Sequence, residues 1–163
     1  MKLQKTNVAR LLDQAKITYQ LVPYEVDESD LSAVHVADQV GAPVAQVFKT
    51  LVLKGDKTGH FVCIIPGDAE LNLKTTAKVS HNKSCEMIPM KDLLAITGYI
   101  RGACSPIGMK KHFPTWIHDS CQNFEAIYVS AGLRGLQIRI APADLIAVIK
   151  ADVVSLVHDN IHS

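Results

Sequence analysis

Residues 47–54 read Val-Phe-Lys-Thr-Leu-Val-Leu-Lys and predict a β-strand whose two faces are both largely apolar. Side chains alternate between the faces of a strand, so Lys49 shares one face with Val47, Leu51 and Leu53. Two interpretations of this lysine remain open. Its ammonium group projects into an interior or a pocket and seeks an anionic or carbonyl partner there. Alternatively, it reaches water from an edge strand and discourages aggregation.

The stretch is followed by a turn and a returning strand. Residues 54–59, Lys-Gly-Asp-Lys-Thr-Gly, predict a hairpin loop, and residues 60–65 predict the second strand, which ends at Pro66-Gly67. Further strands are predicted over 18–24, 84–88, 115–118, 125–130 and 136–140, with a short strand or docked tail over 151–157.

Helices are predicted between these strands. Their start signals are Thr6 or Asn7, Ser32, Pro89 and Pro142, and a further short helix runs through Ala77. Gly41 and Gly98 are the expected residues after the ends of two of them. Short strands, several joined by hairpins, favour an α+β fold with a mixed, largely antiparallel sheet over a doubly wound parallel one.

Composition indicates a globular chain. Its 163 residues suit one domain, residues 1–163, and 48% of them are hydrophobic while 20% are charged. The net charge of +1 excludes a strong overall attraction to nucleic acid, so any such contact needs a local basic patch. The N-terminus lacks the apolar core of a signal peptide, and no apolar run is long enough to cross a bilayer, so we expect a cytoplasmic protein without membrane contacts.

The cysteines and histidines point to no metal or cofactor. Cys63, Cys85, Cys104 and Cys121 lie far apart and form no Cys-x-x-Cys pair, which argues against a disulfide framework and against a zinc site. His112 and His118 show no ligand spacing with each other or with the other histidines. No metal and no cofactor is therefore expected.

Residues 97–111, Thr-Gly-Tyr-Ile-Arg-Gly-Ala-Cys-Ser-Pro-Ile-Gly-Met-Lys-Lys, have neither a helical nor a strand period. Gly98, Gly102 and Gly108 permit unusual backbone angles or a close approach by a ligand, and Ser105-Pro106 predicts a turn. A loop with exposed amides, a hydroxyl and nearby cations suits an anion or a polarised carbonyl. A long connection without a ligand is the alternative.

Four segments together resemble the YbaK/EbsC family of aminoacyl-tRNA editing proteins. They are Phe48-Lys49-Thr50, Leu71-Asn72-Leu73-Lys74, the loop 97–111 and the block 128–136, Tyr-Val-Ser-Ala-Gly-Leu-Arg-Gly-Leu. The resemblance covers residues 5–157, in the family's order and spacing. It implies a sheet curved into a barrel-like core with surrounding helices.

The resemblance also implies roles for matched residues. Lys49 organises the site around the ester and the terminal adenosine, and the backbone of Gly102 holds the substrate carbonyl. Ser130 lines the pocket, and Tyr24 lies near the tRNA end. The remaining matched positions, which belong to the substrate-binding loop, are Ser105, Pro106 and Gly108.

The activity that the resemblance implies is trans-editing, the hydrolysis of cysteine mischarged on the proline tRNA. An aminoacyl ester is already activated, so its hydrolysis needs positioning, a polarised carbonyl and a nucleophile. Ser130 has no histidine partner in a triad-like pattern, and nothing beside Cys104 lowers its pKa, so a pocket-lining role for Cys104 is favoured over a nucleophilic one. In this branch of the family the resemblance implies that the thiol of the substrate attacks its own ester.

Two departures from the family bear on specificity. Gly102-Ala103 stands where relatives often have two glycines, and Ser130-Ala131-Gly132 where they often have Ser-Gly-Gly. The methyl group of Ala103 either narrows the pocket or turns away from it. Substrates with another small residue, alanine or serine, therefore remain an alternative, as does a non-catalytic module that binds the tRNA end or a synthetase.

A local basic rim is expected around the terminal nucleotides. Besides Lys49, its candidates are Arg101, Lys110, Lys111 and Arg134, although Lys110 and Lys111 also suit plain solvated surface. The near-neutral charge fits a protein that does not grip tRNA alone. The partner that the resemblance implies is prolyl-tRNA synthetase, bound transiently.

Overall fold

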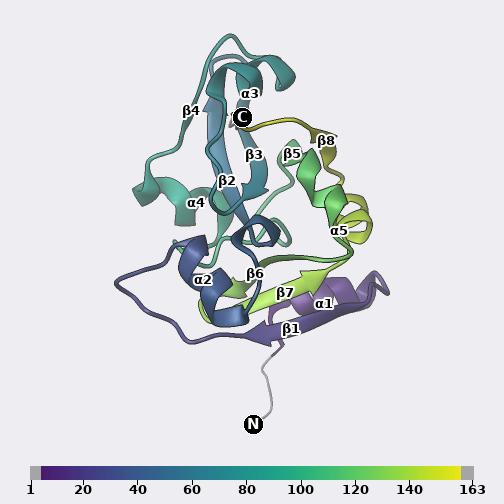
Figure 1. Cartoon of the computed structure of the whole chain (residues 1–163). Helices are drawn as coiled ribbons and strands as arrows, with labels where there is room; N and C mark the ends of the chain where they lie inside the picture. The colour runs from purple at the N-terminus through teal and green to yellow at the C-terminus, as the bar shows by residue number, and fades with distance from the viewer. Residues whose placement is uncertain (1–4, 159–163) are drawn as a thin grey trace, which may run out of the picture.

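Two β-sheets form the framework of the protein, whose computed structural model describes residues 5–158 (Figure 1). One sheet has the strand order β4-β2-β3-β5-β8, and the other has the order β1-β7-β6. The strands are β1 Tyr19–Pro23, β2 Phe48–Gly55, β3 Gly59–Pro66, β4 Cys85–Met87, β5 Thr115–His118, β6 Ile127–Leu133, β7 Leu136–Ile140 and β8 Asp152–Val154. The α-helices are α1 Asn7–Gln14, α2 Ala33–Val40, α3 Leu73–Val79, α4 Leu93–Thr97 and α5 Pro142–Ile149. Residues 1–4 and 159–163 of the expected domain lie outside the described residues.

The strand pairing is mixed and largely antiparallel, which confirms the predicted α+β class. Antiparallel pairs are β1–β7, β6–β7, β2–β3 and β2–β4, whereas β3–β5 and β5–β8 are parallel. A barrel-like core is not confirmed. Across residues 5–158 the strands form two sheets, and the bridge that links them is the isolated parallel contact of Val47 with Tyr128. A barrel closes only through continuous pairing between its strands, which one bridge does not provide.

The main hydrophobic core lies where both sheets and the helices meet. Alternate residues of β3, β6 and β7, such as Ile64, Val129 and Ile138, are fully buried there, and Leu12 of α1 and Leu145 of α5 pack against the same cluster. Burying one such aliphatic side chain stabilises the fold by about 1.5–3 kcal/mol. Because side chains alternate along a strand, the residues between these buried ones lie on the opposite face of each sheet.

The helix ends follow the sequence signals. The Thr6 hydroxyl accepts a hydrogen bond from the Ala9 N–H, and the Ser32 hydroxyl accepts one from the His35 N–H. Gly41 ends α2 in the left-handed conformation, with φ of 73°. Both predicted helices are confirmed, and α2 is thereby held beside the N-terminal end of β2. Across the described part of the chain, no helix combines the length and apolar character that crossing a membrane requires.

Strand β6 runs further than expected. The predicted strand ends at Ser130, but pairing with β7 continues to Leu133, with a register shift between these two residues. Such a bulge inserts extra residues without ending the ladder. Gly132 accommodates it with φ of 92°, where a side chain would be strained. The bulge lies directly after Ser130 and therefore shapes the surroundings of that residue.

Candidate functional site

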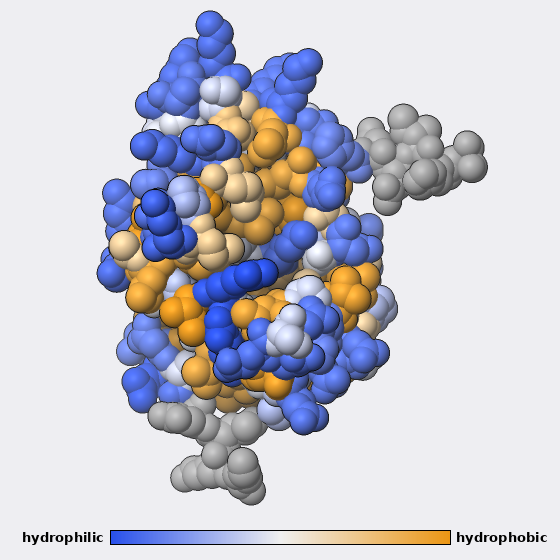
Figure 2. Space-filling view, turned by 90° about the vertical axis from the view of Figure 1, so that its left-hand side faces the viewer, coloured by the Kyte–Doolittle hydropathy of each residue, from blue (hydrophilic) through white to orange (hydrophobic). Residues whose placement is uncertain are grey.

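A cavity of about 340 Å³ opens at the seam between the two sheets, beside the Val47–Tyr128 bridge. We call it the seam cavity. It is lined by Leu31, Ser32, Ala33, Val36, Val47, Phe48, Lys49, Thr50, Leu51, Gly67, Arg101, Gly102, Cys104, Ser130 and Gln137. The fold thus brings four of the predicted site residues together, namely Lys49, Arg101, Gly102 and Ser130. Figure 2, which views the side carrying α2, α4 and β4, shows strongly hydrophilic side chains between apolar areas of the surface.

Lys49 enters the cavity from inside the larger sheet. It pairs with Ile65 of β3 and lines the seam cavity, which favours the pocket interpretation of this lysine. Partial burial lowers its pKa, and the carboxylates of Asp68 and Glu70 act in the opposite direction. Within residues 5–158 its ammonium group has no hydrogen-bond or ion-pair partner, so it is available to a ligand. A partly desolvated cation of this kind attracts a carbonyl or phosphate oxygen more strongly than an exposed one.

The loop of residues 97–111 is fixed against the β6–β7 hairpin. Gly102 has φ of 83°, and a Cβ atom there would lie 3.3 Å from Nε of Arg134 and 3.4 Å from the side chain of Leu31. Arg134 donates a hydrogen bond from Nε to the carbonyl oxygen of Arg101 at 2.8 Å. Its guanidinium also lies 3.9 Å from the carboxylate of Glu28. Arg134 therefore fastens the loop beside Gly102 and does not line the cavity itself.

Ser130 and Cys104 lack the features of nucleophiles. The Ser130 hydroxyl accepts a hydrogen bond from the Gly132 N–H at 3.1 Å, and none of the described histidines hydrogen-bonds to it. Burial raises the pKa of the Cys104 thiol to about 12, so this thiol is protonated at neutral pH. A protonated, buried thiol that faces a cavity suits the pocket-lining role favoured for Cys104.

The other predicted residues lie outside the cavity lining. Ala103 and Ser105 are buried, which fits the alternative that the Ala103 methyl group turns away from the pocket. The Ser105 hydroxyl accepts a hydrogen bond from the Ile107 N–H and holds the turn. Tyr24 packs against the small cluster of Val36, Ala37 and Val47.

Three of the predicted site residues line a different hollow. Pro106, Gly108 and Lys111 face a space of about 250 Å³ beside α1 and α5. Lys111 also stacks over the ring of Phe113, 5.3 Å from its centroid. The remaining lysine, Lys110, donates a hydrogen bond to the carbonyl of Ala95. Their roles toward tRNA therefore stay predictions, and the structure does not place them at the seam cavity.

Two polar residues of the cavity lining, Thr50 and Gln137, were missed as site residues. Thr50 and Gln137 each present a buried oxygen with no hydrogen-bond partner among the described residues. Thr50 lies within the Phe-Lys-Thr motif, so its proximity to Lys49 is a signal that the sequence contains. Gln137 lies opposite Ser130 in the β6–β7 register, which only the pairing of the strands reveals.

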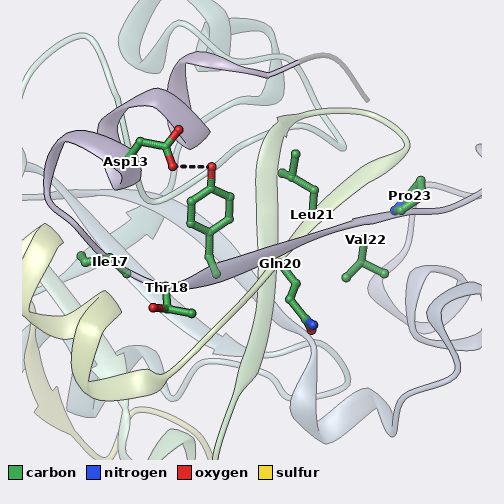
Figure 3. A pocket seen from close by; sticks show the side chains of 8 residues that line it. Asp13, Ile17, Thr18, Gln20, Leu21, Val22 and Pro23 are labelled. Atoms are coloured by element: carbon green, nitrogen blue, oxygen red, sulfur yellow. Dashed lines mark hydrogen bonds between the residues drawn. The ribbon is translucent and has the colours of Figure 1, made fainter. Parts of the chain in front are cut away.

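A wider hollow runs along β1 but holds none of the predicted residues. It has a volume of about 740 Å³ and is lined by Asp13 and residues 17–23. Figure 3 shows Gln20 and Val22 on one side of β1 and Leu21 on the other, with Asp13 hydrogen-bonded to a tyrosine hydroxyl. That donor is Tyr19, at 2.9 Å. Across residues 5–158, His, Cys, Asp and Glu nowhere form a group of three that could hold a metal ion.

The sequence of this chain is similar to that of a known domain family and of known proteins. The aminoacyl-tRNA editing domain family matches residues 28–148. A protein from Enterococcus faecalis, EbsC, which is proposed to be a Cys-tRNA(Pro)/Cys-tRNA(Cys) deacylase, is 51% identical over 144 residues, covering 88% of each chain. The proline–tRNA ligase of Fervidobacterium nodosum is 35% identical over 79 residues, which are 48% of this chain and 14% of the ligase.

A solved structure has the same fold. The crystal structure of a proposed trans-editing enzyme for prolyl-tRNA synthetase superimposes with a TM-score of 0.80 at 21% identity, covering 96% of this chain and all of the other. The fold of two sheets around a seam therefore recurs at low sequence identity.

Proposed function

The chain belongs to the aminoacyl-tRNA editing domain family, and we propose that it hydrolyses the ester bond of cysteine mischarged on the proline tRNA. It is an aminoacyl-tRNA deacylase, a hydrolase that acts on a carboxylic ester and contributes to the fidelity of translation. The observation that supports this function most directly is the seam cavity, which Lys49 and Gly102 both line.

The proposed reaction uses no nucleophile from the protein. The sulfur of the cysteinyl group attacks its own ester carbonyl, a carbon–sulfur bond forms, and the carbon–oxygen bond to the ribose breaks. The proton of the thiol ends on the released ribose hydroxyl, and water then opens the cyclic thioester to free cysteine. The protein supplies positioning and electrostatic stabilisation of the developing oxyanion.

Lys49 and Gly102 carry the catalytic roles in this proposal. The Lys49 ammonium, partly desolvated and without a partner among the described residues, stabilises negative charge on the carbonyl oxygen or the leaving oxygen. The backbone N–H of Gly102, a residue that lines the cavity, donates to the carbonyl in this proposal. Ser130 and Cys104 line the space that the acyl group occupies.

The binding of the tRNA acceptor end and of prolyl-tRNA synthetase is also part of the proposal. The acceptor end of the mischarged tRNA enters the seam cavity, and Arg101 of the lining and Arg134 beside it guide its phosphates in this proposal. Prolyl-tRNA synthetase supplies the selection of the correct tRNA in a transient complex. We place this work in the cytoplasm, where tRNA is charged, and we treat residues 1–163 as one editing domain.

A deacylation panel tests the proposal. The substrates are Cys-tRNA(Pro), Ala-tRNA(Pro) and Ser-tRNA(Pro), and the proteins are wild type, Lys49→Ala and Lys54→Ala, an exposed lysine of the same strand. We expect Cys-tRNA(Pro) to be hydrolysed at least about 100-fold faster than Ser-tRNA(Pro), because a hydroxyl is a much weaker nucleophile than a thiol. Lys49→Ala is expected to lose about 100-fold in kcat/KM, as for a missing oxyanion donor, and Lys54→Ala none.

Two results would contradict it. Equal rates for cysteine and serine esters would exclude attack by the substrate thiol and favour the alternative of a broader deacylase. Tight binding of an acceptor-end analogue without hydrolysis of any substrate would favour the alternative of a non-catalytic module.

A further inference from the structure

Two buried oxygens in the seam cavity accept no hydrogen bond from any of the described residues. They are Oγ1 of Thr50 and Oε1 of Gln137, and Gln137 is only 5% exposed. Buried polar groups in folded proteins nearly always have a partner, so such atoms require an explanation. Across residues 5–158 the remaining atom of this kind is the hydroxyl of Ser120, which does not line the cavity. Two of the three orphaned atoms thus face the same space.

The position of Gln137 is not explained by packing. Leu136, Ile138 and Ile140 of β7 point into the main core, so Gln137 lies on the opposite face, across from Ser130. Side chains on that face would ordinarily reach water, but here the cavity and its walls cover it. An apolar residue of similar size would fill the site with no unpaired oxygen. A glutamine at this position is therefore best explained by a ligand that supplies a hydrogen-bond donor.

The chemistry of the cavity narrows the choice of donor. Its described lining contains the cations Lys49 and Arg101 but no carboxylate, so an N–H or O–H group of the ligand must be held by neutral oxygens. In an aminoacyl ester, the N–H donors nearest the reacting carbonyl belong to the α-amino group. We propose that Gln137 and Thr50 bind the α-amino group of the aminoacyl ester, an inference that rests on the proposed function.

This assignment separates two parts of the ester. Adjacent residues of a strand direct their side chains to opposite faces, so Lys49 and Thr50 approach the ligand from different sides. The carbonyl is then held by Lys49 and Gly102, while the α-amino group is held by Thr50 and Gln137, away from the repelling ammonium. Two fixed substituents on the α-carbon determine where the third one points, which directs the thiol of an L-cysteinyl group.

The test uses a substrate that lacks only this group. A tRNA(Pro) carrying 3-mercaptopropionate retains the ester and the thiol but has no α-amino group. For the wild-type chain we expect a kcat/KM on Cys-tRNA(Pro) that is about 10- to 100-fold higher than on this analogue, the range for lost hydrogen bonds involving a charged group. In Gln137→Leu and Thr50→Val this preference should fall to about 3-fold or less, mainly through loss on the cysteinyl substrate.

Ser120→Ala is the matched control, because it removes an orphaned oxygen outside the cavity and should leave the preference intact. The unfolding midpoint of Gln137→Leu should equal or exceed that of the wild type, since an unpaired buried oxygen is lost. A merely structural role would instead lower the midpoint and reduce the rates on both substrates alike, which would overturn the inference.

Three further results are decisive. Equal wild-type rates on both substrates would overturn the inference while leaving the deacylase function intact. Hydrolysis of neither substrate would overturn the proposed function and this inference with it. If Gln137→Leu instead abolishes discrimination against a tRNA ending in 2′-deoxyadenosine, the donor is a ribose hydroxyl, and the assignment to the α-amino group is wrong.

Discussion

At the scale of single residues, the burial of Lys49 lowers the stability of the folded state, although the residue has a proposed catalytic role. Its burial lowers the pKa, which means that the folded state disfavours the protonated form. We expect Lys49→Met to raise the free energy of unfolding at pH 7, by less than about 1 kcal/mol because the ammonium is still partly hydrated. The same variant should lose deacylase activity.

The gain in free energy of unfolding in Lys49→Met depends on pH, and the lowered pKa of Lys49 determines the direction of this dependence. A lysine whose folded pKa is lowered binds its proton more weakly in the folded state than in the unfolded chain, so wild-type stability rises as pH passes from the folded pKa toward 10.5. The advantage of Lys49→Met should therefore shrink with rising pH in urea titrations. A constant advantage would show that packing, and not charge, causes it. Lys54→Met, at an exposed position of the same strand, should show no such trend.

Cys104 tests whether the protein supplies a nucleophile. With a pKa of about 12, its thiol should react slowly with iodoacetamide at pH 7.5. We expect Cys104→Ala to retain deacylation within about 5-fold of wild type, since only a wall of the cavity changes. Loss of activity by about 1000-fold, together with a burst of bound acyl group, would identify a covalent intermediate instead.

At the scale of elements, Arg134 joins the loop to the hairpin. Because its Nε hydrogen bond to Arg101 holds the backbone beside Gly102, we predict that Arg134→Lys lowers kcat about 10-fold with little change in KM. The positive charge is kept in this variant, so a role limited to attracting tRNA phosphates would leave kcat intact. Arg10→Lys, at an exposed position of helix α1, is the control.

The elements themselves were largely predictable from local signals. The caps at Thr6 and Ser32 and the glycine at position 41 each satisfy backbone groups within a few residues, so a sequence contains them in full. The bulge after Ser130 was not predicted, because it depends on the pairing partner β7. The barrel-like core was inferred from resemblance, whereas closure depends on long-range pairing between β2 and β6.

The residues of the candidate site also differ in whether the sequence reveals them. Lys49 is visible in the sequence because a cation inside an apolar strand violates the pattern. Gln137 is invisible, because a polar residue in an alternating strand satisfies the pattern and its burial arises from elements that cover it. Lys49 can thus be recognised from the local sequence, whereas the burial of Gln137 depends on the tertiary structure.

At the scale of the whole molecule, a net charge of +1 limits how tRNA is held. Contacts confined to the acceptor end would neutralise about three phosphates, which predicts a slope of about −2 for log kcat/KM against log salt. A cysteinylated minihelix of the acceptor stem should accordingly be hydrolysed within about 10-fold of full-length Cys-tRNA(Pro), since one small cavity recognises the ester. Both quantities follow from deacylation rates between 50 and 200 mM KCl. A much steeper slope, or a minihelix rate lower by about 1000-fold, would require a second surface that binds the body of the tRNA.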